Sequence, residues 1–307
     1  METQSRLRPE TPAIPRPNPG QPLSWNRCLR EYQRAPRAGY HYHDVGVFLR
    51  AWLALAVLFA GVAGAQAPSY SAAGVVNASN YAPGPFAPNS ALSLFGTSLA
   101  YATQSLTSDL IVGGELPTVM AGVGVYVDGS LVPLLYVSPL QINFLVPMTE
   151  IAGNAQVTVV RQGVNGPTVT VNLVSAAPQL FSDPGNAGYV LAQDWNAGSA
   201  VITPAAPARG GDILILYATG LGAVAPATAS GELAEYASSV VNLSGLKVII
   251  NGTVLNASAI LYAGLTPGSA GLYQINLVLP SNSGTNPEVQ VSAGDQVSAA
   301  GCKLAVQ

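Results

Sequence analysis

The sequence predicts an all-β protein built of two tandem antiparallel β-sandwiches. One segment occurs twice, because residues 134–147 read LLYVSPLQINFLVP and residues 260–280 read ILYAGLTPGSAGLYQINLVLP. A duplicated segment of this kind indicates a duplicated structural unit. The 32 Gly and 24 Pro residues separate many short apolar runs, and this pattern favours strands over helices.

The charge is sparse and unevenly placed. Charged residues make up 9% of the chain, and the part after residue 50 holds four basic and eleven acidic residues, a net charge of −7. Such a surface predicts no nucleic-acid partner. The first 44 residues are rich in Pro and Arg and have no apolar period, so we expect a disordered leader. Our hypothesis is that these residues are a start-site artefact, with translation beginning near Val45 or Val47, and the alternative is an unusually long leader.

Residues 45–65 are typical of a signal peptide. The apolar stretch 51–65, AWLALAVLFAGVAGA, is shorter than the roughly 20 residues of a transmembrane helix and ends in small residues. We predict cleavage after Ala65, because cleavage after Ala67 would leave Pro68 at the new N-terminus. The alternative is an uncleaved membrane anchor. The expected location is periplasmic, cell-surface or extracellular, with membrane contact only through the signal segment during export.

The first repeated unit follows a linker expected over residues 66–86 and covers residues 87–182. Its first strand is Ala91–Phe95, and a later strand, Val123–Val127, runs into the tight-turn dipeptide Asp128-Gly129. In the repeated motif, alternation places Ile142 and Phe144 on one face and polar side chains on the other. Further strands are expected over 156–161 and 168–174.

A connector is expected over residues 183–211, with a hairpin pairing 189–193 with 200–203. The second unit, residues 212–307, opens with the strand Asp212–Tyr217 and has its tight turn at Asn251-Gly252. Strands over 289–292 and 303–306 are expected to close it. Each unit of about 100 residues has the size of an immunoglobulin-like domain, so the predicted fold is two tandem immunoglobulin-like β-sandwiches.

Four blocks carry a family resemblance: LFGTSLA, LLYVSPLQINFLVP, ILILYATGLG and LYAGLTPGSAGLYQINLVLP. They resemble an uncharacterised C-terminal domain family of secreted soil-bacterial proteins, which is similar to IPT/TIG-type immunoglobulin-like modules. The resemblance covers roughly residues 72–307. It implies a fold and an exported context, and it implies no catalytic residues.

Absent residue types exclude several chemistries. Both histidines, His41 and His43, precede the predicted cleavage site, so the mature chain would have no Ser-His-Asp triad and no His-ligated metal. Cys302 would be its only cysteine, because Cys28 lies in the leader, and no intrachain disulfide is possible. We expect no cofactor, no metal and no enzymatic activity.

Carboxylate pairs leave a hydrolase open as an alternative. Glu232 with Glu235, or Asp183 with Asp194, could serve as acid and base in glycoside hydrolysis. The other interpretation makes the glutamates solvated loop charges and Asp183-Pro-Gly a turn. A calcium site formed by Asp183, Asn186 and Asp194 is a further possibility, although no recognised calcium loop is present.

The repeated motif contributes the remaining candidate residues. We interpret them as structural, although amides and tyrosines of this kind also occur in binding sites; they are Tyr136, Gln141, Asn143, Tyr262, Gln274 and Asn276. Tyr273 is similarly expected in a core or at a corner. Trp195, at the predicted hairpin tip, is the one possible contact residue, and the alternative is packing against the neighbouring domain.

The leading functional hypothesis is a secreted, non-enzymatic tandem module for adhesion, scaffolding or protein interaction. Exposed loops or an open sheet edge would make its contacts. The second hypothesis is a polysaccharide-binding accessory module that uses exposed aromatic residues such as Trp195. The third is the carboxylate-based glycoside hydrolase. The predicted partner is therefore a protein or a cell-surface polysaccharide.

Overall fold

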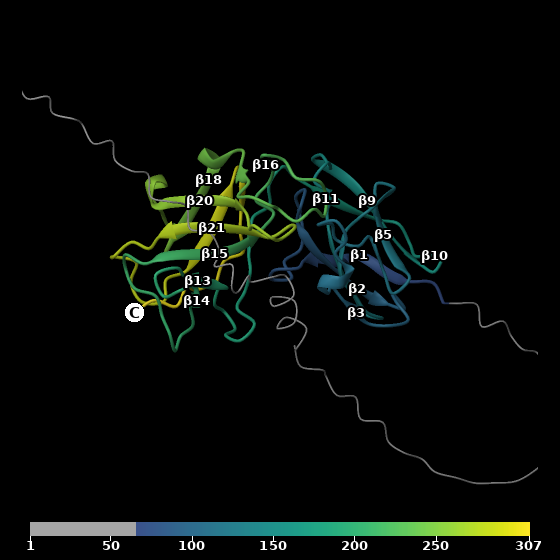
Figure 1. Ribbon diagram of the computed structural model, residues 1–307, viewed down its shortest axis with the longest axis horizontal. Coiled ribbons are helices and arrows are strands. Elements are labelled where there is room, and N and C mark those ends of the chain that lie inside the picture. Colours follow the sequence, from purple (N-terminus) through teal and green to yellow (C-terminus); the bar gives the residue numbers. More distant parts are fainter. Residues whose placement is uncertain (1–65) are drawn as a thin grey trace, which may run out of the picture.

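The computed structural model describes residues 66–307, which form two β-sandwiches lying side by side (Figure 1). The expected leader (1–44) and signal peptide (45–65) lie outside these residues. Regular structure within 66–307 consists of strands and three short 3-10 helices. No helix in this range is long and apolar enough to cross a membrane.

Domain 1 consists of a five-stranded and a six-stranded antiparallel sheet. Its elements are β1 Ser69–Asn77, β2 Ala91–Thr97, β3 Gln104–Ser105, η1 Ser108–Leu110, β4 Val119–Met120, β5 Val123–Val127, β6 Ser130–Leu131, β7 Leu134–Val137, β8 Gln141–Leu145, β9 Gly153–Arg161, β10 Val164–Asn165 and β11 Val169–Leu173. The first sheet has the order β1-β2-β8-β7-β3. The second has the order β10-β9-β5-β4, with β11 also pairing with β9 and β6 with β5.

Domain 2 consists of an eight-stranded and a four-stranded antiparallel sheet. Its elements are β12 Gln179–Leu180, β13 Ala192–Asp194, β14 Ala200–Val201, β15 Ile213–Thr219, β16 Val224–Ala225, β17 Ser239–Val240, η2 Leu243–Gly245, β18 Leu246–Ile250, β19 Thr253–Val254, η3 Ala257–Ala259, β20 Ile260–Leu265, β21 Tyr273–Val278, β22 Val289–Ala293 and β23 Gln296–Val297. The large sheet has the order β14-β13-β15-β21-β20-β17-β16, with β12 pairing with β15. The small sheet has the order β19-β18-β22-β23.

Each sandwich encloses its own apolar core, as strand alternation predicts. Ile142 and Phe144 of β8 lie in the core of domain 1, and Ile275 and Leu277 of β21 lie in the core of domain 2. All four side chains are at most 1% exposed. Full burial of such a side chain contributes roughly 1.5–3 kcal/mol, so the repeated motif supplies a central strand of each core.

The two predicted tight turns form. Asp128 and Gly129 have φ of 45° and 83°, and Asn251 and Gly252 have φ of 48° and 76°. Positive φ at both central residues is what a two-residue hairpin of this type requires, and Asp, Asn and Gly adopt it most readily. These turns join β5 to β6 and β18 to β19.

The structure corrects the expected linker over residues 66–86. This range contains β1, which pairs with β2 in the first sheet of domain 1. Val75, opposite Leu94, is 3% exposed and packs in the core of that domain. The small residues around it, which suggested a linker, lie at an irregularity between Tyr70 and Val75.

The structure also revises the connector and the C-terminal strand. The hairpin of β13 and β14 forms, but β13 and the earlier β12 both pair with β15 and so belong to the large sheet of domain 2. Residues 303–306 make only isolated bridges. Leu304, Ala305 and Val306 are buried in succession, so their side chains do not alternate as those of a strand at a sheet surface would.

Candidate functional site

A third apolar cluster joins the two domains. It includes Leu135 and Leu145 of domain 1 and Ile215, Tyr217 and Leu272 of domain 2. Three hydrogen bonds accompany it, from the backbone nitrogens of Ala91, Leu116 and Leu233 to Thr219 Oγ1 (2.9 Å), the Gly231 carbonyl (3.0 Å) and the Gly114 carbonyl (2.8 Å). Apolar burial combined with directional bonds holds the domains in one arrangement.

The polar residues of the repeated motif lie on the sheet face opposite each core. In β8, Gln141 Nε2 donates to Asn143 Oδ1 at 2.8 Å, and Ser93 Oγ of the neighbouring strand donates to the same oxygen at 2.9 Å. In β21, Gln274 Nε2 donates to Asn276 Oδ1 at 3.1 Å. The same amide–amide contact therefore occurs in both copies.

The paired tyrosines lie opposite these amides. Tyr136 faces Asn143 across β7 and β8 and is half-buried, whereas Tyr262 faces Asn276 across β20 and β21 and is 3% exposed. The Tyr262 hydroxyl donates to the Leu265 carbonyl at 2.8 Å and lies 3.2 Å from the Ser238 carbonyl. Burial raises the pKa of Tyr262 above its ordinary value of 10.0.

The two copies differ in how far this face is covered. Gln274 and Asn276 are 2% and 0% exposed, whereas Gln141 is only partly buried. Opposite Gln141 lies Phe95, whose side chain is 38% exposed. Tyr81 packs edge-on against Phe95, with ring centroids 5.5 Å apart and an interplanar angle of 69°. We call Tyr81, Phe95 and Gln141 the aromatic face.

Strand alternation could have identified part of the aromatic face. Leu92 and Leu94 of β2 point into the core, so Phe95 must point outward. Tyr81, which is 40% exposed, lies outside the strands and adopts φ of 60°, so no strand period could place it. Neither aromatic residue belongs to a motif that marks it as a contact.

Trp195 follows β13, and its backbone nitrogen donates to the Ile213 carbonyl at 2.8 Å. Its side chain is partly buried and packs against the third apolar cluster. Trp195 therefore begins the turn of the β13–β14 hairpin, with its side chain against an apolar cluster rather than fully open.

The carboxylates of the predicted pairs accept hydrogen bonds within their own separate turns. Asp183 is 7% exposed and accepts from Gly185 N at 2.8 Å and from Asn186 Nδ2 at 2.7 Å. Glu232 Oε2 accepts from the Ala229 backbone nitrogen at 2.7 Å, and Glu235 is exposed. Among residues 66–307 no group of three or more His, Cys, Asp or Glu side chains is arranged to hold a metal ion.

A carboxylate pair that the sequence did not suggest forms between Asp194 and Asp212. Partial burial is the main cause that raises the pKa of Asp194, and the charge of Asp212 is the second. Hydrogen bonds from the backbone nitrogens of Ala197 and Asn196 oppose the shift. The Asp194 Oδ1 accepts from those two nitrogens at 3.3 and 2.9 Å. No further His, Cys, Asp or Glu among residues 66–307 joins this pair to form a metal site, so its effect is limited to the pKa of Asp194.

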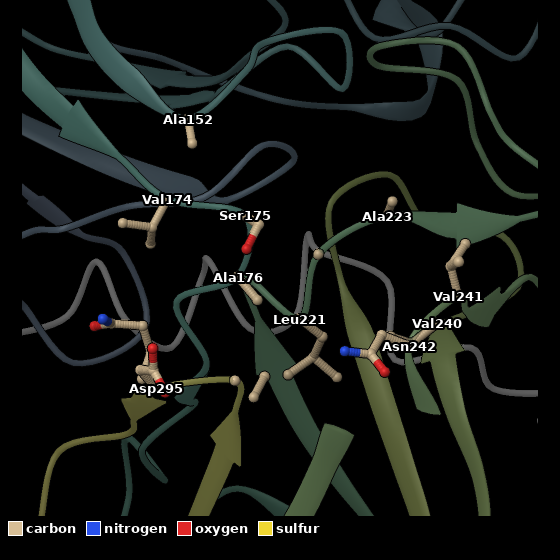
Figure 2. Close-up of a pocket in the computed structure, with 14 residues that line it drawn as sticks. Ala152, Val174, Ser175, Ala176, Leu221, Ala223, Val240, Val241, Asn242 and Asp295 are labelled. Carbon is tan, nitrogen blue, oxygen red and sulfur yellow. The ribbon is translucent and has the colours of Figure 1, made fainter. Parts of the chain in front are cut away.

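A cleft of about 520 Å³ opens where the domains meet. Figure 2 shows Ser175 and Ala176 of the chain leaving domain 1 above Leu221, with Asp295 and Asn242 on either side. The wall is mostly apolar and small; it consists of Ala152, Val174, Ser175, Ala176, Leu221, Gly222, Ala223, Val240, Val241, Asn242, Ala293, Gly294, Asp295 and Gln296. The size is that of a ligand pocket, but its lining has a single carboxylate and no aromatic ring.

No protein-family model and no curated protein matches the chain. Among solved structures, a surface glycan-binding protein from Prevotella bryantii is 13% identical, with 76% of this chain and 41% of that chain covered and a TM-score of 0.23. The SGBP-B protein of a mixed-linkage glucan utilization locus of Bacteroides ovatus, in complex with a heptasaccharide, is 10% identical, with 72% and 43% covered and a TM-score of 0.28. Domains 5–6 of the S-layer protein SbsC are 12% identical, with 78% and 98% covered and a TM-score of 0.23.

The chain therefore spans less than half the length of the first two of these proteins. Identity and TM-score are low in all three comparisons, so they assign no function. The all-β, immunoglobulin-like architecture is assigned from the antiparallel sheets and their strand orders.

Proposed function

We propose that this chain is an exported, non-enzymatic binding module that holds a polysaccharide on the aromatic face of domain 1. One observation carries the proposal: Phe95 and Tyr81, 38% and 40% exposed, pack edge-on against each other, and Phe95 lies opposite the partly buried Gln141. In domain 2 the equivalent of Gln141, Gln274, is 2% exposed, so this partly open amide belongs to the first copy alone.

The chemistry of this face suits a neutral sugar chain. A pyranose ring presents weakly positive C–H groups on one side, and an aromatic ring presents a negative face to receive them. Polar groups beside an apolar platform fix the orientation of a ligand, and the Gln141 amide has that place here. The low charge of the chain, 9% of residues, favours a neutral ligand over an ionic one.

Substitution of Phe95 tests the proposal. We expect Phe95→Ala in the purified 66–307 chain to weaken retention on the polysaccharide it binds by about five- to tenfold, as loss of one aromatic contact of up to about 1.5 kcal/mol implies. Affinity electrophoresis through gels that contain individual soluble polysaccharides measures the change. Tyr236→Ala is the matched control, since Tyr236 is 71% exposed in domain 2 and should leave retention unchanged. Equal retention of wild type and Phe95→Ala on every retaining polysaccharide would refute the proposed site.

The same gels test one finer part of the proposal. Trp195 is proposed as a secondary contact, and because its ring is partly buried, Trp195→Ala should weaken retention less than Phe95→Ala. The repeated amides and tyrosines are proposed to be structural. We further propose that the chain is exported, with cleavage after Ala65, and that it is related to secreted IPT/TIG-type modules.

A protein-binding scaffold is the second candidate, and the cleft between the domains favours it. Val241 in its wall is 64% exposed, and the docked domains would hold the cleft in a fixed shape. Retention of the chain on cell envelopes but on none of the polysaccharides would favour this candidate. Val241→Asp should then abolish envelope retention, whereas Phe95→Ala should not change it.

A further inference from the structure

Arg161 at the end of β9 is a buried cation with an unusual set of partners. Its side chain is 2% exposed, and its guanidinium donates to the backbone carbonyls of Ser98 and Gln66. The guanidinium carbon also lies 4.0 Å from the centre of the Tyr101 ring. Carbonyl oxygens and an aromatic face, rather than a carboxylate, thus compensate its charge within the described chain.

One of those partners has a special place in the chain. Gln66 is the residue that would become the N-terminus after cleavage behind Ala65. Its side chain is exposed, whereas Pro68, two residues on, is buried against the domain. Arg161 therefore fixes the backbone of this residue at its carbonyl and leaves its side chain room to move.

Cleavage would create a charge conflict at this position. The new α-ammonium of Gln66 would be separated from the carbonyl that Arg161 binds by a single Cα atom. Two positive charges would then lie within several ångströms of each other, and their repulsion disfavours the protonated amine. The neutral amine, which this repulsion favours, is the nucleophilic form.

We propose that the mature chain carries pyroglutamate at position 66. The neutral α-amine attacks the side-chain Cδ of Gln66, a C–N bond forms to close a five-membered lactam, and the side-chain amide C–N bond breaks. The side-chain nitrogen leaves as ammonia with the proton that the amine gives up, so the step needs no oxidant or other reactant. The inference rests on the proposed export and cleavage, but not on polysaccharide binding.

The lactam resolves the conflict and preserves the contact. It carries no charge, so the repulsion with Arg161 disappears, while the Gln66 backbone carbonyl still accepts from the guanidinium. The modification also removes the free amine that aminopeptidases require. The first strand, β1 Ser69–Asn77, would then begin three residues after a blocked and anchored end.

Mass spectrometry of the secreted full-length gene product tests the inference. We expect the N-terminal peptide to begin at position 66 and to be one ammonia lighter than its unmodified form. A peptide that begins at Gln66 with a free amine would overturn the inference and leave export intact. A different N-terminus would overturn the inference and the proposed cleavage together. Neither result affects the gel assay, so failure of the pyroglutamate inference can be told apart from failure of the polysaccharide-binding proposal.

The role of Arg161 has its own readout. In samples taken at one fixed time after secretion, we expect Arg161→Gln to contain about two- to threefold less cyclised N-terminus, because the neighbouring charge that favours the neutral amine is gone. Lys247→Gln, which removes an exposed cation from β18 of domain 2, is the control and should match wild type. An unchanged cyclised fraction in Arg161→Gln would refute the role of Arg161. If that variant is not secreted, urea-unfolded and folded wild type are compared, and faster cyclisation in the folded chain is the supporting result.

Discussion

The hydroxyl of Tyr273 links the core of domain 2 to domain 1. It donates to the Gly222 carbonyl at 2.6 Å and accepts from Asn89 Nδ2 at 3.2 Å. Burial raises the pKa of Tyr273 well above its ordinary value of 10.0, while the Asn89 bond opposes the shift. A phenol with a raised folded-state pKa contributes stability that is complete below its unfolded pKa and is lost as pH rises toward the folded pKa.

We therefore predict that the free energy of unfolding falls above about pH 10, where the unfolded chain ionises this phenol and the folded chain does not. Tyr273→Phe should cost about 1–2 kcal/mol at pH 7, through the lost hydrogen bonds, and should have a flatter alkaline limb. Urea unfolding between pH 7 and pH 11 measures both effects. Tyr236→Phe, at an exposed tyrosine, should keep the wild-type slope. A Tyr273→Phe slope as steep as wild type would contradict the prediction.

At the scale of a strand, β20 depends on a glycine where β17 approaches it. A Cβ atom on Gly264 would lie 2.1 Å from the Ser238 carbonyl oxygen and 2.5 Å from Tyr262 Oη. We predict that Gly264→Ala lowers the free energy of unfolding by about 2–3 kcal/mol, because the added methyl group meets backbone that cannot yield locally. Gly185→Ala is the control, since its Cβ would meet nothing closer than 3.4 Å. Similar urea midpoints for the two variants would count against this explanation.

Most strands could be predicted from the sequence because their signals are local. Alternation around Ile142 and Ile275 gave the core faces, and Asp128-Gly129 and Asn251-Gly252 gave the tight turns. The strand β1 could not be predicted in the same way. Its small residues are typical of a linker, and only pairing with β2 makes them a strand.

The aromatic face is also only partly predictable from the sequence. Phe95 follows from the strand period, since its neighbour Leu94 points into the core. Its partner Tyr81 reaches it through a loop in which Tyr81 has positive φ, and that geometry depends on the surrounding fold rather than on local sequence. The difference in burial between Gln141 and Gln274 likewise cannot be read from the motif, because both copies have the same Gln-Ile-Asn sequence.

At the scale of the whole molecule, the two domains are docked through a shared apolar cluster and direct hydrogen bonds. The interface combines the third apolar cluster with side-chain bonds between residues far apart in the chain, such as Ala91 and Thr219, which are 128 positions apart. Gly271 shows how close the approach is, because a Cβ atom there would lie 2.4 Å from a methyl group of Leu145. We therefore expect the unfolding of one domain to be coupled to that of the other.

Thr219→Val tests this coupling with almost no change of shape. Thr219 is fully buried, and its Oγ1 accepts from the Ala91 backbone nitrogen at 2.9 Å. The substitution leaves that nitrogen buried and unpaired, so we predict a loss of about 1–3 kcal/mol and faster hydrogen exchange at the Ala91 amide than in wild type. Calorimetry should show one transition for wild type and an additional, earlier transition for the variant, because loosened domains unfold separately. Thr170→Val, at an exposed threonine of β11, should retain the wild-type profile. If Thr219→Val kept wild-type stability and wild-type exchange at Ala91, the bond between Thr219 and Ala91 would not contribute to holding the domains together.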